Sequence, residues 1–190
     1  MKKLLTLLLV LFTATAFSQG YKGDIKKVLN EYSSFIKVKN VDTLFGYMYP
    51  KFFDVFPRQT LVAGMKKTFA DTNLTMVFGD VKITSVSDIY EENKIKYVVV
   101  NYTNEIQLTL SPTIGTQAVL ENMKNTYETA YGAANVTSDF ATRTFNIKAT
   151  NAMFAINDPA YGNRWWLLEK KDELKTYVAG MIPAKAWELK

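Results

Sequence analysis

The chain has 190 residues, of which 48% are hydrophobic, so it has the size of one domain that can bury a core. It contains no histidine and no cysteine, which excludes Ser-His-Asp and Cys-His catalysis and the usual zinc sites, because each needs an imidazole or a thiolate. The formal net charge of +5 comes from lysines scattered along the chain, whereas nucleic-acid binding needs a concentrated basic face, so we predict no nucleic-acid partner.

Residues 1–18 have the pattern of a secretory signal peptide, in which two lysines precede an apolar run from residue 4 to residue 12. The run is too short to span a bilayer, which takes roughly 20 residues. A buried N-terminal helix is the alternative, but the run has no polar face. We therefore expect an exported protein, periplasmic or secreted, with residues 19–190 as its single domain and no membrane anchor after cleavage.

Helical periodicity follows the signal peptide. Apolar residues recur at i, i+3, i+4 and i+7 over residues 25–36, which predicts a helix with one apolar stripe. Asn40 is typical of the N-cap of a short second helix, which Pro50 would end. Residues 50–57 predict an aromatic loop, and a third helix is expected after Pro57.

The spacing of the apolar residues then changes from the 3.6-residue period of a helix to the two-residue period of a strand. Residues 80–110 predict two long strands joined at Glu92-Asn93. On the second strand, we assign the row that contains Tyr102 to the interior and the row that contains Glu105 to the outside. Residues 115–131 return to helical spacing.

The last third of the chain predicts a second hairpin, with strands over residues 143–157 and 164–171 around a turn rich in Asp, Pro, Gly and Asn. The tail has helical spacing at Leu174, Tyr177 and Val178, before Gly180 and Pro183.

Trp165 and Trp166 are adjacent in this second hairpin. Successive side chains of a strand point to opposite faces, so the two indoles cannot enter the same core. We expect a strand that is covered on both faces, with Trp166 inward and Trp165 outward on the side of Glu169. A partner interface or the rim of a pocket is the alternative place for the outer indole.

The chain resembles the nuclear-transport-factor-2-like superfamily, which includes SnoaL-like cyclases and ketosteroid isomerases. The resemblance covers most of residues 24–170 and is carried by "IKKVLNEYSSFIKVKNVDTLFGYMYPKFF", "PRQTLVAGMKKTFAD" and "RWWLLEK". It implies an α+β fold in which N-terminal helices pack on a strongly curved antiparallel sheet, a cone-shaped, cystatin-like roll with a cavity. It also implies a homodimer that pairs through the outer sheet face. The helix near 115–131 and the tail after residue 171 depart from the compact family pattern.

Enzymes of this superfamily place an Asp, or an Asp/His pair, in the cone together with a Tyr donor. Without histidine, Asp54 is the candidate base here, with Tyr32 or Tyr102 as donor; a solvated loop residue is the alternative reading of Asp54. We predict that Tyr32, Phe53, Tyr102 and Trp166 line the pocket, and we predict no metal site and no cofactor.

The aromatic, histidine-free interior favours an exported, non-catalytic domain. It would bind a small apolar or amphipathic ligand in the pocket, or serve as an interaction module. The alternative is a proton-transfer isomerase or cyclase that uses an Asp base.

Overall fold

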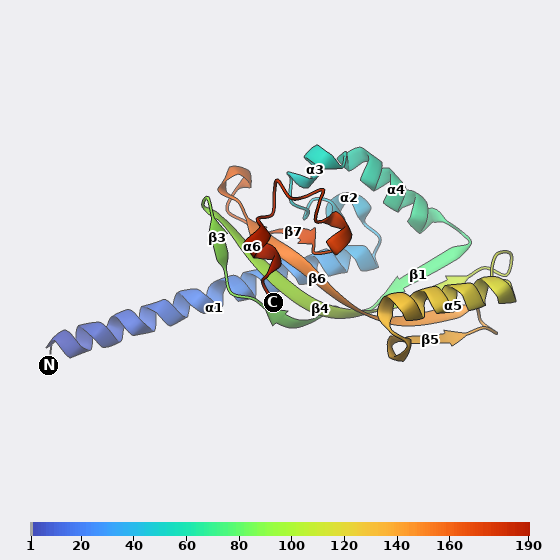
Figure 1. Ribbon diagram of the computed structural model, residues 1–190, viewed down its shortest axis with the longest axis horizontal. Helices are drawn as coiled ribbons and strands as arrows, with labels where there is room; N and C mark the ends of the chain where they lie inside the picture. Colours follow the sequence, from blue (N-terminus) through green and yellow to red (C-terminus); the bar gives the residue numbers. More distant parts are fainter. Residues whose placement is uncertain (1) are drawn as a thin grey trace.

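A computed structural model describes the backbone of residues 2–190 and the side chains of residues 20–190. The fold is α+β, as predicted: helices are followed by a seven-stranded antiparallel sheet that does not close on itself (Figure 1). The predicted signal peptide, residues 1–18, lies outside the residues whose side chains are described. Within the described part of the chain, no helix combines the length and the apolar character that crossing a membrane requires.

Four helices precede the sheet: α1 (Lys2–Lys37), α2 (Val41–Leu44), α3 (Phe52–Val55) and α4 (Arg58–Ala70). The predicted cap of α2 is confirmed, since the Asn40 side chain accepts a hydrogen bond from Thr43 N at 3.2 Å. The predictions that α2 extends to Pro50 and that residues 50–57 form a loop are wrong. The chain leaves the helix early because Tyr49 N donates to Leu167 O at 2.9 Å, and the one-turn helix α3 follows.

The sheet is organised around two long strands, β4 (Ile95–Leu110) and β6 (Thr144–Asn157), which pair with each other along their length. Strands β1 (Leu74–Phe78), β2 (Lys82–Val86) and β3 (Tyr90–Glu92) pair with β4, whereas β5 (Val136–Asp139) and β7 (Trp166–Glu169) pair with β6. The remaining elements are α5 (Gln117–Tyr131), α6 (Ala184–Trp187) and the 3-10 turns η1 (Ala133–Asn135), η2 (Pro159–Tyr161) and η3 (Asp172–Leu174).

The predicted helix near 115–131 and the second hairpin are confirmed by α5 and by the pairing of β6 with β7. The first predicted hairpin is only partly right. Its first strand is broken into β2 and β3, because the Ser87 hydroxyl accepts from Val99 N at 2.9 Å and interrupts the backbone ladder. Its turn lies at Asn93 and Lys94, which both have positive φ, and β1 was not predicted.

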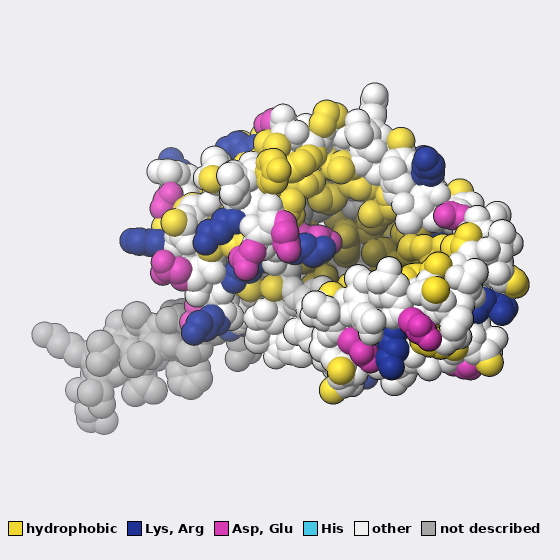
Figure 2. Space-filling view, turned by 45° about the vertical axis from the view of Figure 1, so that its right-hand side comes forward, with side chains coloured by type: hydrophobic (Ala, Val, Ile, Leu, Met, Phe, Trp, Pro, Cys, Tyr) yellow, Lys and Arg dark blue, Asp and Glu magenta, His cyan; other side chains and the backbone are white. Residues whose placement is uncertain are grey.

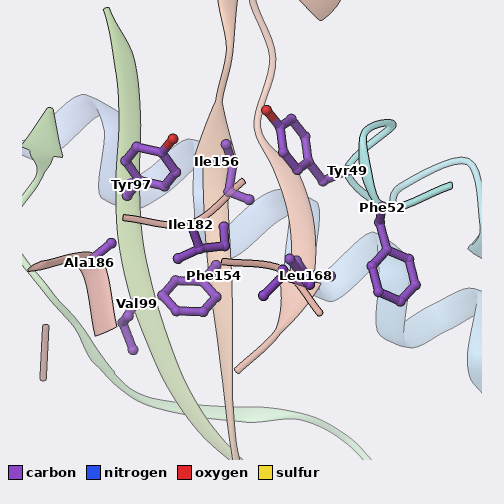
Figure 3. Close-up of a cluster of buried hydrophobic side chains, with 10 residues drawn as sticks. Tyr49, Phe52, Tyr97, Val99, Phe154, Ile156, Leu168, Ile182 and Ala186 are labelled. Carbon is purple, nitrogen blue, oxygen red and sulfur yellow. The ribbon is translucent and has the colours of Figure 1, made fainter. Parts of the chain in front are cut away.

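Both faces of the sheet are covered at the β7 end. On one face, α1 packs Ile25 and Leu29 against Val98 and Val100. On the other face, the C-terminal tail encloses the Phe154 ring, as Figure 3 shows. The assignment of one β4 row to the outside is therefore wrong at this end, since the tail buries the outward row as well. At the far end of the sheet, that row does face outward, with Glu105 exposed.

The tail is not the helix that its spacing predicts. It forms η3, a series of turns and the short α6. Side chains anchor it to the sheet: Tyr97 Oη donates to Met181 O at 3.1 Å, and Lys170 Nζ donates to Leu189 O at 2.8 Å. An irregular path lets Val178 and Ile182 both reach the buried cluster.

The two tryptophans lie on opposite faces, as strand alternation predicts. Trp165 is only 8% exposed and packs under α1 with Val98 and Val100 of the inward row. Both faces of the strand are therefore covered, as expected, but the assignment of Trp166 inward and Trp165 outward is wrong. Trp166 is half-buried and packs against the cluster under the tail. The strand pattern correctly predicts that the two indoles point to opposite faces. The face of Trp165 is covered by α1, which lies at the opposite end of the sequence and which the strand pattern cannot indicate.

Alkaline pH is expected to destabilise the fold through Tyr97. Burial, together with the negative charge of Asp158, raises the pKa of Tyr97 to about 12, compared with about 10 in an unfolded chain. Below pH 10 the tyrosine is neutral in both states, so its contribution to stability is complete. Between pH 10 and 12 only the unfolded chain loses the proton, and about 2–3 kcal/mol is lost. Urea unfolding across this range should show a shallower decline for Tyr97→Phe than for the wild type; equal declines would contradict the assignment.

Candidate functional site

A cavity of about 200 Å³ lies between α1, the sheet and the end of α5; we call it the inner cavity. Figure 2 shows the molecule from the side on which the surface is hollowed between α4 and α5, with hydrophobic side chains lining the hollow. The apolar walls of the inner cavity come from α1, the β1 region and the sheet: Leu29, Ile36, Phe78, Val81, Ile106 and Ala149. Its polar walls are Tyr32, Ser33, Tyr102, Asn104, Asn151 and Glu169, with Lys171 and Tyr131 at the edge.

Helical and strand periodicity bring these side chains together. On α1, Leu29, Tyr32, Ser33 and Ile36 are spaced i, i+3, i+4 and i+7, so they share one face of the helix. On the sheet, alternate residues of β4 point toward α1, and the β4–β6 register places Tyr102 opposite Asn151. The cavity lies over the middle of the sheet, between the C-terminal part of α1 and the C-terminal end of α5.

The hydroxyl groups of Tyr32 and Tyr102 are the most informative polar groups in the cavity. Among the residues whose side chains are described, neither hydroxyl has a hydrogen-bond partner in the protein. Five of the other tyrosine hydroxyls donate to protein oxygens, namely those of Tyr21, Tyr47, Tyr49, Tyr90 and Tyr97. Those of Tyr127, Tyr131, Tyr161 and Tyr177 have no partner among the described side chains either, but of these four only Tyr131 reaches the inner cavity, at its edge. Two tyrosines that face a cavity without a partner are available to donate to a ligand.

Burial raises the pKa of both Tyr32 and Tyr102, and the negative charge of Glu169 raises it further. Both hydroxyls are protonated at neutral pH, as an ordinary tyrosine is, and the raised pKa extends this state into the alkaline range. They act as hydrogen-bond donors, which suits a ligand that carries an acceptor oxygen or nitrogen.

Two asparagines complete the polar wall. Asn151 Nδ2 donates to Asn104 Oδ1 at 2.9 Å, which fixes the orientation of both amides. The Asn104 amide nitrogen and the Asn151 carbonyl oxygen keep free hydrogen-bonding capacity. The wall thus offers a donor and an acceptor side by side.

An ion pair lies at the rim, where Lys171 Nζ is 2.8 Å from Glu169 Oε2. The two side chains are 55% and 41% exposed, so water screens the pair. Partial burial lowers the pKa of Lys171, but its hydrogen bond and charge interaction with Glu169 outweigh that effect and the pKa is raised. The two charges offset each other, and the rim carries little net charge.

The structure brings two of the predicted pocket residues, Tyr32 and Tyr102, into this cavity. Phe53 lies elsewhere, half-buried against Phe52, and Trp166 lies on the other face of the sheet, with the Arg164 guanidinium 4.1 Å from the centre of its ring. Asp54 is exposed on α3.

Sequence reasoning missed Ser33, Asn104, Asn151, Glu169 and Lys171. Helical spacing from Leu29 could have indicated Ser33, and alternation already placed Asn104 beside Tyr102. Glu169 was assigned to the outer face with Trp165. It shares that face in the structure, but α1 extends over it and makes it a cavity wall.

Comparisons with models of protein families, with curated proteins and with solved structures found no match for this chain. The function therefore has to be argued from the geometry of the cavity.

The cavity is suited to binding. Among the side chains of residues 20–190, no three acidic, histidine or cysteine groups gather where they could hold a metal ion. Proton transfer in an apolar pocket depends on a carboxyl group that is shielded from water, whereas the Glu169 carboxylate is half-exposed and paired with Lys171. The donors and acceptors on one wall, facing apolar side chains on the others, match an amphipathic molecule.

Proposed function

We propose that this chain is an exported, non-catalytic binding domain for a small amphipathic molecule, built as a nuclear-transport-factor-2-like cone with the inner cavity as its pocket. The observation that carries the proposal is the pair of cavity-facing hydroxyls on Tyr32 and Tyr102, which have no partner among the described side chains. Neither hydroxyl is among the fully buried polar atoms that lack a partner, so water reaches both, and a ligand acceptor would take the place of that water.

The polar group of the ligand would lie against Tyr32, Tyr102 and the asparagine pair, and its apolar part against Leu29 and Phe78. A volume of about 200 Å³ sets a limit of one small ring system or a short chain. A longer apolar part would lie in the hollow between α4 and α5, which hydrophobic side chains line in Figure 2.

Removing one tyrosine hydroxyl is expected to weaken binding without weakening the fold. The probe is an uncharged fluorophore with one ketone acceptor, 6-propionyl-2-dimethylaminonaphthalene, whose ketone end would enter the inner cavity and whose amino end would extend out of it. Its emission should shift to the blue on saturable binding to the wild type. Tyr32→Phe and Tyr102→Phe should each raise the Kd about 3- to 10-fold, since a neutral hydrogen bond contributes about 0.5–1.5 kcal/mol.

Tyr177→Phe is the matched control, because this tyrosine is 60% exposed and lies outside the cavity. It should bind the probe as the wild type does. Equal affinities for all four proteins, or no saturable binding to the wild type, would remove the case for this pocket.

A second candidate function is a proton-transfer enzyme of the isomerase or cyclase type. The observation in its favour is the Glu169 carboxylate in the same cavity as two tyrosine donors, so Glu169 replaces the exposed Asp54 as the candidate base. Exchange of α-protons of a bound ketone for deuterium, followed by NMR, separates the two functions. Exchange that Glu169→Gln abolishes and Asp54→Asn leaves intact would favour the enzyme.

A further inference from the structure

The edge of β6 that carries β5 and β7 has an unpaired stretch in its middle. From one end β7 pairs with β6 as far as Met153, and from the other end β5 pairs with it as far as Ile147. One more bond, from Lys170 N to Ala152 O at 3.0 Å, extends the β7 side. Residues 148–151 therefore have no strand beside them on this edge, and we call this stretch the edge gap.

A cleft of about 800 Å³ lies at the edge gap; we call it the outer cleft. Five residues line both the outer cleft and the inner cavity: Tyr102, Tyr131, Asn151, Glu169 and Lys171. The outer cleft is also lined by Asn101 and Thr150. These two alternate with Tyr102 and Asn151 along their strands, so they belong to the opposite face of the sheet. The cleft thus passes around the edge, from one face to the other, at the place where the strands leave it open.

We propose that the edge gap is the entrance to the inner cavity and that the Lys171–Glu169 ion pair is its gate. The identity of the ligand rests on the proposed function, whereas the passage itself is a property of the fold. Opening the gate requires movement of side chains only, because no backbone ladder closes the gap. A half-exposed ion pair contributes at most about 1 kcal/mol, so the gate opens at small cost.

The gate also selects by charge. Its lysine and its carboxylate offset each other, so neither an anion nor a cation gains by approaching it, and the donors behind it are uncharged hydroxyls. The ligand class that fits this passage is an uncharged amphipathic molecule with at least one hydrogen-bond acceptor.

The absence of cysteine from the chain allows a test that needs no ligand. Ser33→Cys places the only thiol in the wall of the inner cavity, at a position that is 5% exposed. The rate at which the uncharged reagent methyl methanethiosulfonate modifies this thiol in the folded protein measures access to the cavity. Ile36→Cys, also in the cavity wall, serves if Ser33→Cys does not fold.

Two further changes are then combined with the thiol. Ala130→Trp adds bulk at the outer cleft, on the exposed side of α5, and should slow modification about 5-fold or more. Lys171→Ala removes half of the gate and should accelerate it. Ala118→Trp adds the same bulk at an exposed position of α5 away from both cavities and should leave the rate unchanged.

Equal rates for Ala130→Trp and Ala118→Trp would overturn the entrance, and so would slower modification in Lys171→Ala. The same variants without the thiol, mixed with the ketone fluorophore, separate this inference from the proposed function. A slower association rate in Ala130→Trp supports both. Modification rates that follow the expected order while the wild type binds no probe would keep the entrance and remove the proposed ligand class.

Discussion

Replacing Trp165 with alanine is expected to lower the free energy of unfolding by about 3–5 kcal/mol, the usual cost of truncating a buried tryptophan. Trp165 is 8% exposed and packs with Ile25, Leu29 and Leu167. Its removal leaves a void between α1 and the sheet, which two rigid elements cannot close by relaxing. Urea unfolding, monitored by circular dichroism, measures the loss.

Replacement by phenylalanine gives a matched comparison of the two tryptophans, in which Trp166→Phe should cost less than Trp165→Phe. Trp166 Nε1 is buried and has no hydrogen-bond partner among the described residues, so the substitution removes an unsatisfied donor along with part of the ring. Trp165→Phe, by comparison, removes only well-packed atoms. A larger loss for Trp166→Phe than for Trp165→Phe would show that the two faces have been assigned the wrong way round.

Asp158→Ala is expected to destabilise the protein by about 3 kcal/mol, because hydrogen bonds to buried charged groups are strong and a buried partner left alone is costly. The Tyr49 hydroxyl donates to Asp158 Oδ2 at 2.6 Å, and Ala160 N donates to Oδ1 at 2.9 Å. Both side chains are buried under the tail, so water cannot replace the lost acceptor.

A double-mutant cycle with Tyr49→Phe isolates the contribution of this pair, which should show a coupling of about 0.5–3 kcal/mol. Asp139→Ala is the control, since Asp139 accepts from Ala141 N at 2.9 Å in a similar turn that is exposed. Losses of similar size for Asp158→Ala and Asp139→Ala would mean that burial does not strengthen the Tyr49–Asp158 interaction.

The elements that could be predicted from the sequence are those in which one local pattern decides the structure. The helical stripe over residues 25–36, the Asn40 cap, the helix after Pro57 and the turn between β6 and β7 all depend on neighbours within a few residues. Each of them is present in the structure. The α+β class follows from their order.

Predictions failed where distant parts of the chain decide what is covered. The outward row of β4 is buried because the last twenty residues fold back over it, and no pattern within β4 indicates that. The tail has the spacing of a helix, yet hydrogen bonds from the Tyr97 and Lys170 side chains to its carbonyl groups hold it in turns. Trp165 was assigned to the wrong environment for the same reason.

The residues of the candidate site also fall into these two groups, those that a local pattern predicts and those that depend on distant parts of the chain. Tyr32 and Tyr102 could be predicted, since large polar aromatics on an apolar stripe and on an inward row suit a pocket. Asn151 and Glu169 could not, because they become cavity walls only through the β4–β6 register and the length of α1. The ligand class remains a prediction that the binding experiment tests, and export and the homodimer also remain predictions.

Among the described residues, each of the other five strands of this sheet has either β4 or β6 as its only partner strand. Those two strands are separated in sequence by α5, η1 and β5, so their pairing closes a long loop, and such non-local pairing is slow to form. Within the part of the chain that the structure describes, this pairing is also the only strand ladder that joins the group of strands on β4 to the group on β6. We therefore expect the sheet to unfold cooperatively. In hydrogen exchange, the slowest amides should be those at the centre of β4 and β6. Several side chains of the inner cavity project from these same two strands.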